Sequence, residues 1–326
     1  LVGRWDRRRL LVASLLWYGA WHAMAAMAPG FDGLLTSRVL AMVSAAVFTP
    51  QAAACIGLLV PEHQRGRGIT FVFLGWSVAS VLGTPLGAWI GGTFGWRWTM
   101  ALMAALSLIA AIWLQARMPQ GVVPAPLSAS AWRRALLSPT LMLTLSITVV
   151  SAAGQFALLS YLAPYVAHRF GLGAAALSSL LLVYGLCGFA GNAAVSRWID
   201  PLGPSRAMAW ALSSIALGMG LVGLTTTFVT MVLAVVPWGL GVFASNSSQQ
   251  ARLVALAPTL APASIALNTS AMYAGQALGA GGGGWLILHG GLESLPIAGC
   301  AGLLCALGLS LWATRQAQRH PIRTHA

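Results

Sequence analysis

Long apolar stretches alternate with short polar segments along the whole chain. A helix of about 20 predominantly apolar residues is long enough to cross the hydrocarbon core of a bilayer. Ten stretches come near or exceed this length when the chain is divided at charges and at Gly and Pro breaks. They cover residues 10–28, 34–59, 69–92, 98–116, 140–164, 174–196, 207–225, 228–251, 263–288 and 295–313. The pattern predicts an all-α polytopic membrane protein.

The composition also indicates a lipid environment. Hydrophobic residues make up 58% of the 326 residues and charged residues only 7%, whereas a soluble domain carries about 25% charged residues. The net charge of +13 comes from arginines that are spread over the chain, and no lysine is present. We therefore expect a lipid bilayer and no nucleic acid among the partners.

The arginines are distributed unevenly between the two sides of the predicted bundle. Fifteen of the 18 fall on the side that carries the cluster at residues 4–9. The opposite side receives Arg97 and Arg169, and Arg38 lies within a span. An excess of Lys and Arg marks the cytoplasmic side of a membrane protein. Ten spans then place both ends of the chain in the cytoplasm.

One connection between spans is much longer than the others. Residues 117–138 contain PQGVVPAPLSASAWRR, whose prolines and small polar residues predict a cytoplasmic linker. The linker separates a half-bundle at residues 1–116 from a six-helix bundle at residues 139–314. We expect residues 315–326 to form a cytoplasmic tail.

Two pairs of segments indicate an internal repeat. GRWD at 3–6 resembles SRWID at 196–200, and LGTPLGAWIGG at 82–92 resembles LGAGGGGWLIL at 278–288, with offsets of 193 and 196 residues. A parallel repeat of this length is typical of duplicated transporter halves. Two predicted spans precede SRWID in the second half, and none precedes GRWD. We therefore expect that the chain is truncated at its N-terminus and that two helices are missing.

Several of these segments resemble the major facilitator superfamily. RWDRRRLL is similar to the family's cytoplasmic loop motif, and SRVLAMVSAAVFTPQAAACIGLLVPEHQRGRG to its fourth helix and the following loop. FLGWSVASVLGTPLGAWIGGTFGWRW resembles the antiporter signature of the fifth helix. PWGLGVFASNSSQQARL and NTSAMYAGQALGAGGGGWL resemble helices of the drug:proton antiporter branch, which is related to arabinose and purine-nucleoside efflux permeases.

The resemblance implies a two-bundle fold in which ten of twelve transmembrane helices are present. It also implies secondary active efflux of a small organic solute or drug, by alternating access, in a bacterial cytoplasmic membrane. Gly3 stands where the loop motif normally has an aspartate that holds the outward-open state. This departure leaves Asp6, Arg8 and Asp200 as the gating candidates near the two loop segments.

Glycines recur every four residues at corresponding places in the two halves. They are Gly83, Gly87 and Gly91 in the first half and Gly275, Gly279 and Gly283 in the second. Small residues at this spacing let two helix backbones approach closely in lipid. Either the two faces make ordinary helix contacts, or they form the interface along which two bundles rock. Pro85 adds a bend, because it removes a backbone hydrogen bond.

Arg38 and His22 are the candidates for proton coupling. A charge within a span costs about 2.5–3.5 kcal/mol on insertion scales, so it marks a pathway or finds a partner; alternatively Arg38 snorkels to the interface. His22 either relays protons or makes a hydrogen bond in packing. No Asp or Glu lies deep in a predicted span. Coupling therefore rests on His22 or on the missing helices, or transport is not coupled to protons.

Uncharged polar residues within the spans are the candidates for a substrate cavity near mid-membrane. The first choices are Gln155, Tyr184, Asn268 and Tyr273, followed by Gln51, Asn246 and Gln276. Each could instead make an interhelical hydrogen bond. The lack of an acid among them favours a neutral or weakly polar solute over a strong cation.

Motifs of enzymes and metal sites are absent from the sequence. There is no Walker loop, no Gly-x-Ser-x-Gly and no His-Glu-x-x-His, and the four cysteines lack metal-like spacing. We expect a monomer that is not an enzyme, holds no cofactor or metal, and has a small solute and a proton as its ligands. Two alternatives stay open: an uptake symporter for a small metabolite, and a truncated membrane protein that does not transport.

Overall fold

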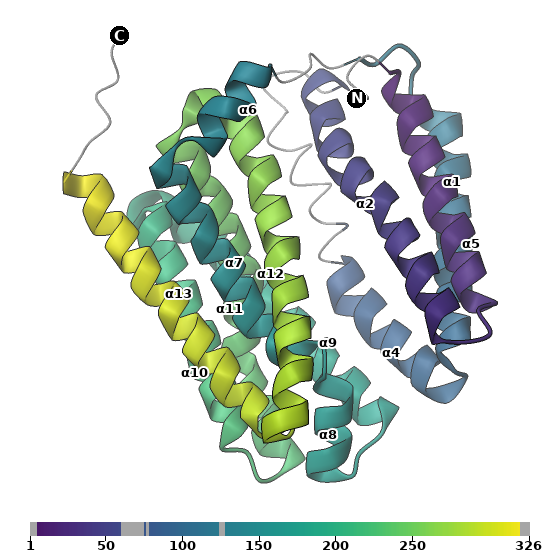
Figure 1. The fold of residues 1–326 in the computed structure, drawn as a ribbon, viewed down its shortest axis with the longest axis vertical. Coiled ribbons are helices and arrows are strands. Elements are labelled where there is room, and N and C mark those ends of the chain that lie inside the picture. Colours follow the sequence, from purple (N-terminus) through teal and green to yellow (C-terminus); the bar gives the residue numbers. More distant parts are fainter. Residues whose placement is uncertain (1–4, 60–74, 76–77, 124–127, 320–326) are drawn as a thin grey trace. The chain divides into compact units, whose positions relative to one another are not determined.

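The computed structural model describes residues 5–59, 75, 78–123 and 128–319, and every regular element in this part of the chain is a helix (Figure 1). An α-helix pairs its backbone N–H and C=O groups within itself, whereas lipid offers these groups no hydrogen-bond partners. Seven of the described helices are long and apolar enough to cross a membrane. The predicted all-α class is confirmed, while the total of ten spans stays a prediction.

The chain divides into two compact units, Leu1–Pro126 and Leu127–Ala326. The division falls inside the segment predicted as a linker. The first unit contains α1 (Arg7–Ala26), α2 (Phe31–Leu59), α4 (Thr84–Thr93) and α5 (Trp96–Arg117). Helix α1 packs against both α2 and α5, and α4 packs against α5.

The predicted span 69–92 is described only in its second part. Residues Ala79–Gly83 form a π-helical turn that leads directly into α4. Pro85, in the first turn of α4, has no N–H for the carbonyl of Val81, and its ring would clash with that carbonyl in a regular α-helix. The wider π turn directly before Pro85 accommodates both effects.

The described part of the second unit contains six long α-helices and two short ones, besides a 3-10 turn at Pro258–Leu260. They are α6 (Ala129–Leu136), α7 (Pro139–Leu159), α8 (Leu162–Phe170), α9 (Ala174–Leu202), α10 (Pro204–Gly223), α11 (Phe228–Leu256), α12 (Ala261–Gly290) and α13 (Ser294–Arg319). Helix α7 packs against both α12 and α13. Helix α10 packs against α11 and α13, and α9 packs against α11.

The predicted span 140–164 is not one helix. Helix α7 ends at Leu159 and α8 begins at Leu162. Pro164 cannot donate a hydrogen bond to the Ser160 carbonyl, so a continuous helix would lose this bond. The break at Ser160 and Tyr161 places Pro164 in the first turn of α8, where a missing N–H costs little.

The predicted linker contains a helix that the sequence analysis did not anticipate. Ser128 caps α6 by accepting a hydrogen bond from the backbone N–H of Ala131 at 3.1 Å. Ala135 is fully buried in a cluster with Leu141 and Leu253, and Trp132 packs against this cluster. The prolines of the segment before α6 indicated a linker without regular structure, so this short amphipathic helix was not predicted.

The glycine face of α12 makes its contact inside the second unit. A Cβ atom at Gly275 would meet Val149 and Ala152 of α7, and one at Gly279 would meet the backbone of Ala153. A Cβ at Gly283 would meet Ala157 and Tyr161. These three glycines therefore make a close helix contact with α7, and a role in an interface between two bundles stays a prediction.

The corresponding glycine face of the first unit has fewer close contacts with described residues. A Cβ at Gly87 or Gly91 would contact Thr99 of α5, at 3.6 and 3.0 Å. A Cβ at Gly83 would have only Ala79 within 4 Å among the described residues. The two glycine faces therefore differ in their surroundings, although their spacing is the same.

We expect Gly279→Ala to destabilise the protein, because the added methyl overlaps the backbone of Ala153, which no rotamer change relieves. Overpacking of this kind costs about 1–3 kcal/mol. Gly281→Ala is the matched control, since a Cβ there meets nothing within 4 Å. Thermal unfolding in detergent should show a lower midpoint for Gly279→Ala only. Equal midpoints would contradict the close α7–α12 contact.

Candidate functional site

The two coupling candidates lie against each other in the first unit. His22 in α1 is completely buried. Its Nε2 lies 2.9 Å from Nη1 of Arg38 in α2, and its Nδ1 lies 2.8 Å from the carbonyl oxygen of Tyr18. The same Arg38 nitrogen lies 3.8 Å from Sδ of Met100 in α5. Arg38 has thus found a partner inside the bundle.

This geometry requires a neutral imidazole. A carbonyl oxygen only accepts and a guanidinium only donates hydrogen bonds. Nδ1 of His22 must therefore carry the hydrogen that goes to Tyr18, and Nε2 must be the unprotonated acceptor for Arg38. No described carboxylate forms an ion pair with Arg38. Protonation of Nε2 would remove the acceptor and place two positive charges in contact, so proton binding and the Arg38 contact exclude each other.

A chain of neutral polar groups lies in the second unit. The Thr148 hydroxyl of α7 donates to Oδ1 of Asn268 in α12 at 2.7 Å. It also accepts a hydrogen bond of 2.9 Å from Nε2 of Gln249 in α11, which donates in addition to the Thr144 carbonyl at 2.6 Å. All four residues are buried. The network joins three helices and includes one first-choice cavity residue, Asn268.

Gln249 is a polar residue that the sequence analysis missed. Its Oε1 is buried and has no hydrogen-bond partner in the described part of the chain. An unpaired amide oxygen in a buried network is costly unless a ligand or water pairs with it. The polar run SNSSQQAR contained the signal for this residue. The sequence analysis selected only Asn246 from it, because the pattern does not show which side of the helix faces α7.

The other cavity candidates do not form a single cluster with Asn268. Gln155 is buried on α7, and its Nε2 donates to the Ser151 carbonyl of the same helix. Tyr184 makes an edge contact with the buried Trp238, with ring centroids 5.2 Å apart.

The remaining candidates lie at more accessible positions. Asn246 accepts a hydrogen bond from Gln250, Tyr273 is exposed, and Gln276 and Gln51 are half-buried. A role in solute binding stays a prediction for all of these residues.

The gating candidates make local contacts. Asp6 caps α1 through the backbone N–H of Arg8 at 3.0 Å and accepts a second hydrogen bond from the Gly121 N–H. Nε of Arg8 lies 3.4 Å from Oε1 of Gln115 in α5. Asp200 is exposed near the end of α9, and Gly3 lies outside the described residues. A gating role stays a prediction.

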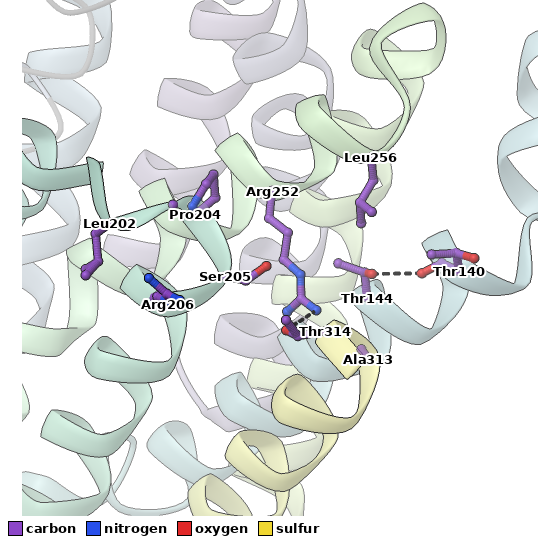
Figure 2. Close-up of a pocket in the computed structure, with 11 residues that line it drawn as sticks. Thr140, Thr144, Leu202, Pro204, Ser205, Arg206, Arg252, Leu256, Ala313 and Thr314 are labelled. Carbon is purple, nitrogen blue, oxygen red and sulfur yellow. Dashed lines mark hydrogen bonds between the residues drawn. The ribbon is translucent and has the colours of Figure 1, made fainter. Parts of the chain in front are cut away.

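A cavity of about 360 Å³ opens at one end of the second unit. Its walls come from the start of α7, the turn between α9 and α10, and the last turns of α11 and α13 (Figure 2). Arg252 and Thr144 belong to the lining. The cavity therefore adjoins the polar network, because Thr144 is common to both.

Comparisons with known proteins agree on one family. The model of the Major Facilitator Superfamily matches residues 1–280. The uncharacterized MFS-type transporter YbcL of Bacillus subtilis is 25% identical over 315 residues, which is 95% of this chain and 80% of that protein. The inner membrane transport protein YdhP of Escherichia coli is also 25% identical over 315 residues, covering 94% and 80% of the two chains.

Solved transporter structures share the fold. A bacterial homolog of the human lysosomal transporter Spinster has a TM-score of 0.73 and 17% identity, over 97% of this chain and 84% of that one. The human organic anion transporter MFSD10 has a TM-score of 0.69 and 18% identity, over 95% and 78%. At these identities the likeness concerns the fold alone.

We expect Thr148→Val to weaken the second unit, because valine keeps the shape of threonine but pairs with neither Gln249 nor Asn268. Interhelical hydrogen bonds in membranes contribute about 0.6 kcal/mol on average and up to about 1.7. A double-mutant cycle with Asn268→Ala should give a coupling energy in this range.

The control for this substitution is Thr269→Val, since the Thr269 hydroxyl donates to the Ile265 carbonyl of its own helix and to no other described residue. It should leave the unfolding midpoint nearly unchanged. A coupling energy of zero between Thr148 and Asn268 would show that this hydrogen bond adds nothing to stability.

Proposed function

The chain belongs to the Major Facilitator Superfamily, and we propose that it is a proton-coupled secondary transporter that exports a small organic solute by alternating access. Its relatives and structural neighbours are transporters and not enzymes, and its apolar helices make it a multi-pass membrane protein. Proton coupling and the class of solute go beyond this family membership and are argued from the described contacts, whereas export is proposed from the segments that resemble the antiporter branch.

The contact between His22 and Arg38 is the observation that carries the proposal of proton coupling. An antiporter needs a group whose charge changes during the cycle. His22 provides one without a carboxylate, because its Nε2 binds either a proton or Arg38. When a proton takes Nε2, the guanidinium is released from its acceptor and must find another partner. Protonation is thereby linked to a rearrangement between α1 and α2.

The neutral network of the second unit supports the proposed class of solute. Gln249 offers an amide oxygen that accepts a hydrogen bond, and the surrounding groups of Thr148 and Asn268 carry no charge. A strong cation would find no counter-charge in this network. We therefore propose a neutral or weakly polar solute, with Gln155, Tyr184 and Tyr273 as further contacts.

The proposal places the protein in the bacterial inner membrane as a monomer without a cofactor. In this proposal both ends of the chain lie in the cytoplasm, and the excess of arginines on one side supports this orientation. The gating assignments of Asp6, Arg8 and Asp200 belong to the same proposal, since all three lie near the segments that resemble the family's loop motif.

The direction of coupling can be tested in sealed vesicles that contain the purified protein and trapped pyranine, a pH-sensitive dye. The solute is first selected as a compound to which expressing cells gain resistance. When it is added outside, an antiporter releases protons as the solute enters, so the lumen becomes alkaline. A symporter would acidify the lumen, and a protein that does not transport would change nothing.

We expect His22→Gln to reduce the solute-driven proton flux to background, because glutamine accepts from Arg38 but does not take up a proton. His289→Gln is the matched control: the Nδ1 of His289 bonds to the Trp285 carbonyl four residues earlier, as that of His22 does to Tyr18, but His289 is exposed. A variant at His22 with full proton flux would overturn its assignment as the coupling residue.

A further inference from the structure

The cavity at the end of the second unit carries a positive charge that no acidic residue of its described lining balances. Eleven described residues line it, and they include no Asp or Glu. Two of them are arginines, Arg206 and Arg252. Four others, Thr140, Thr144, Ser205 and Thr314, carry hydroxyl groups. The chemistry of the lining is therefore that of a site for an anion.

Arg252 is the buried charge of this cavity, with only 4% of its surface exposed. Its Nη1 donates to the Ser310 hydroxyl at 2.9 Å. Its Nη2 donates to the Thr314 hydroxyl at 3.2 Å (Figure 2). The same nitrogen donates to the Ser310 carbonyl at 3.4 Å. All of these partners are neutral, and no described carboxylate forms an ion pair with Arg252.

An unbalanced charge at such a position is costly. A charged group that is removed from water needs a counter-charge as well as hydrogen bonds, and unpaired ones usually mark a binding site or a pathway. Ser310 and Thr314 fix the orientation of the guanidinium but do not neutralise it. A bound anion would supply the missing charge.

The start of α10 adds donors to the same wall. Gly203 caps this helix without a side-chain hydrogen bond, and Pro204 follows. The backbone N–H groups of Ser205 and Arg206 belong to the first turn, where an α-helix leaves its N–H groups unpaired. This helix end favours an anion through its dipole. Leu202 and Arg206 are exposed at the rim, so a ligand can reach the cavity from the surface.

We propose that this cavity binds the phosphate group of an anion between Arg252, Arg206 and the first turn of α10. A phosphate group has several oxygens that accept hydrogen bonds, and arginine binds it with two parallel ones. The volume lies within the range of about 300–1,000 Å³ that is usual for small-molecule sites, so the phosphate can carry an organic substituent.

Two sources of this phosphate have the same chemistry. The arginine distribution assigns this end of the helices to the cytoplasmic side, where basic pockets between helices bind the headgroups of anionic lipids. A soluble phosphate compound of the cytoplasm would reach the same groups. The experiment therefore needs one arm for each source.

The test measures the unfolding midpoint of the purified full chain in detergent by its tryptophan fluorescence. One arm titrates inorganic phosphate against chloride at equal ionic strength. The other titrates phosphatidylglycerol against phosphatidylcholine. We expect a saturable rise of the midpoint with one or both anionic ligands. Stabilisation by phosphatidylglycerol alone identifies a lipid headgroup, and stabilisation by phosphate identifies a site that soluble phosphates can enter.

Three variants locate the binding. Arg252→Gln should raise the apparent dissociation constant at least about tenfold, which corresponds to one charge-assisted hydrogen bond. Arg206→Gln should raise it as well, and it decides the matter if Arg252→Gln does not fold, because Arg206 is exposed. Arg169→Gln is the control, since Arg169 pairs with Glu293 at 3.0 Å outside the cavity.

The outcomes that overturn the proposal are equally definite. The proposal is wrong if neither anion stabilises the wild-type chain beyond its control ligand. It is also wrong if all variants respond to the anions as the wild type does. In the second case phosphate acts on the surface charge of the whole molecule and not in this cavity. The unfolding midpoints are measured without transport, so the result does not depend on the proton-coupled export proposed above.

Discussion

Close approach of helix backbones is the constraint on which the second unit depends. In lipid no hydrophobic effect drives helices together, so they associate through tight contact, and small residues permit it. Gly154 of α7 faces the backbone of Gly299 in α13, while Gly279 of α12 faces α7 from another side. Gly191 of α9 meets Leu240, and Gly218 of α10 meets Trp238, both in α11. Because these contacts reach backbone atoms, rotamer changes cannot relax them, and the relative positions of the helices are closely restricted.

The polar groups rely on these restricted positions. Thr148 meets Asn268 and Gln249 because α7 lies close to both α12 and α11. One turn earlier, the Thr144 carbonyl accepts from Gln249, and the same residue lines the cavity that contains Arg252. The neutral network and the basic cavity are therefore neighbours along α7. The first unit differs in chemistry, since its partly buried contact between α1 and α2 joins a charged arginine to a neutral imidazole.

The sequence named several of these residues individually but not their arrangement. His22 and Arg38 were selected because ionisable residues are rare within spans. The short connection between α1 and α2 makes these two helices neighbours. Asn268 was selected as a polar residue in an apolar span, whereas its partners Thr148 and Gln249 were not. Arg252 was counted only as a charge on the cytoplasmic side. Its burial could not be predicted, because it depends on Ser310 and Thr314, which lie about 60 positions later in the chain.

The sequence by itself determined the helical class and the membrane environment. Long apolar runs with few charges are stable in lipid and not in water, and in lipid a chain must pair its backbone groups internally, as an α-helix does. The division between the two units falls inside the segment that the sequence predicts as a linker. The tertiary structure decided which face of each helix turns inward: the glycines of α12 face α7, and the amide of Gln249 faces Thr148. The physical reason is that a helix surrounded by lipid is apolar on its outer face as well as its inner one, so the pattern along the chain does not distinguish the two.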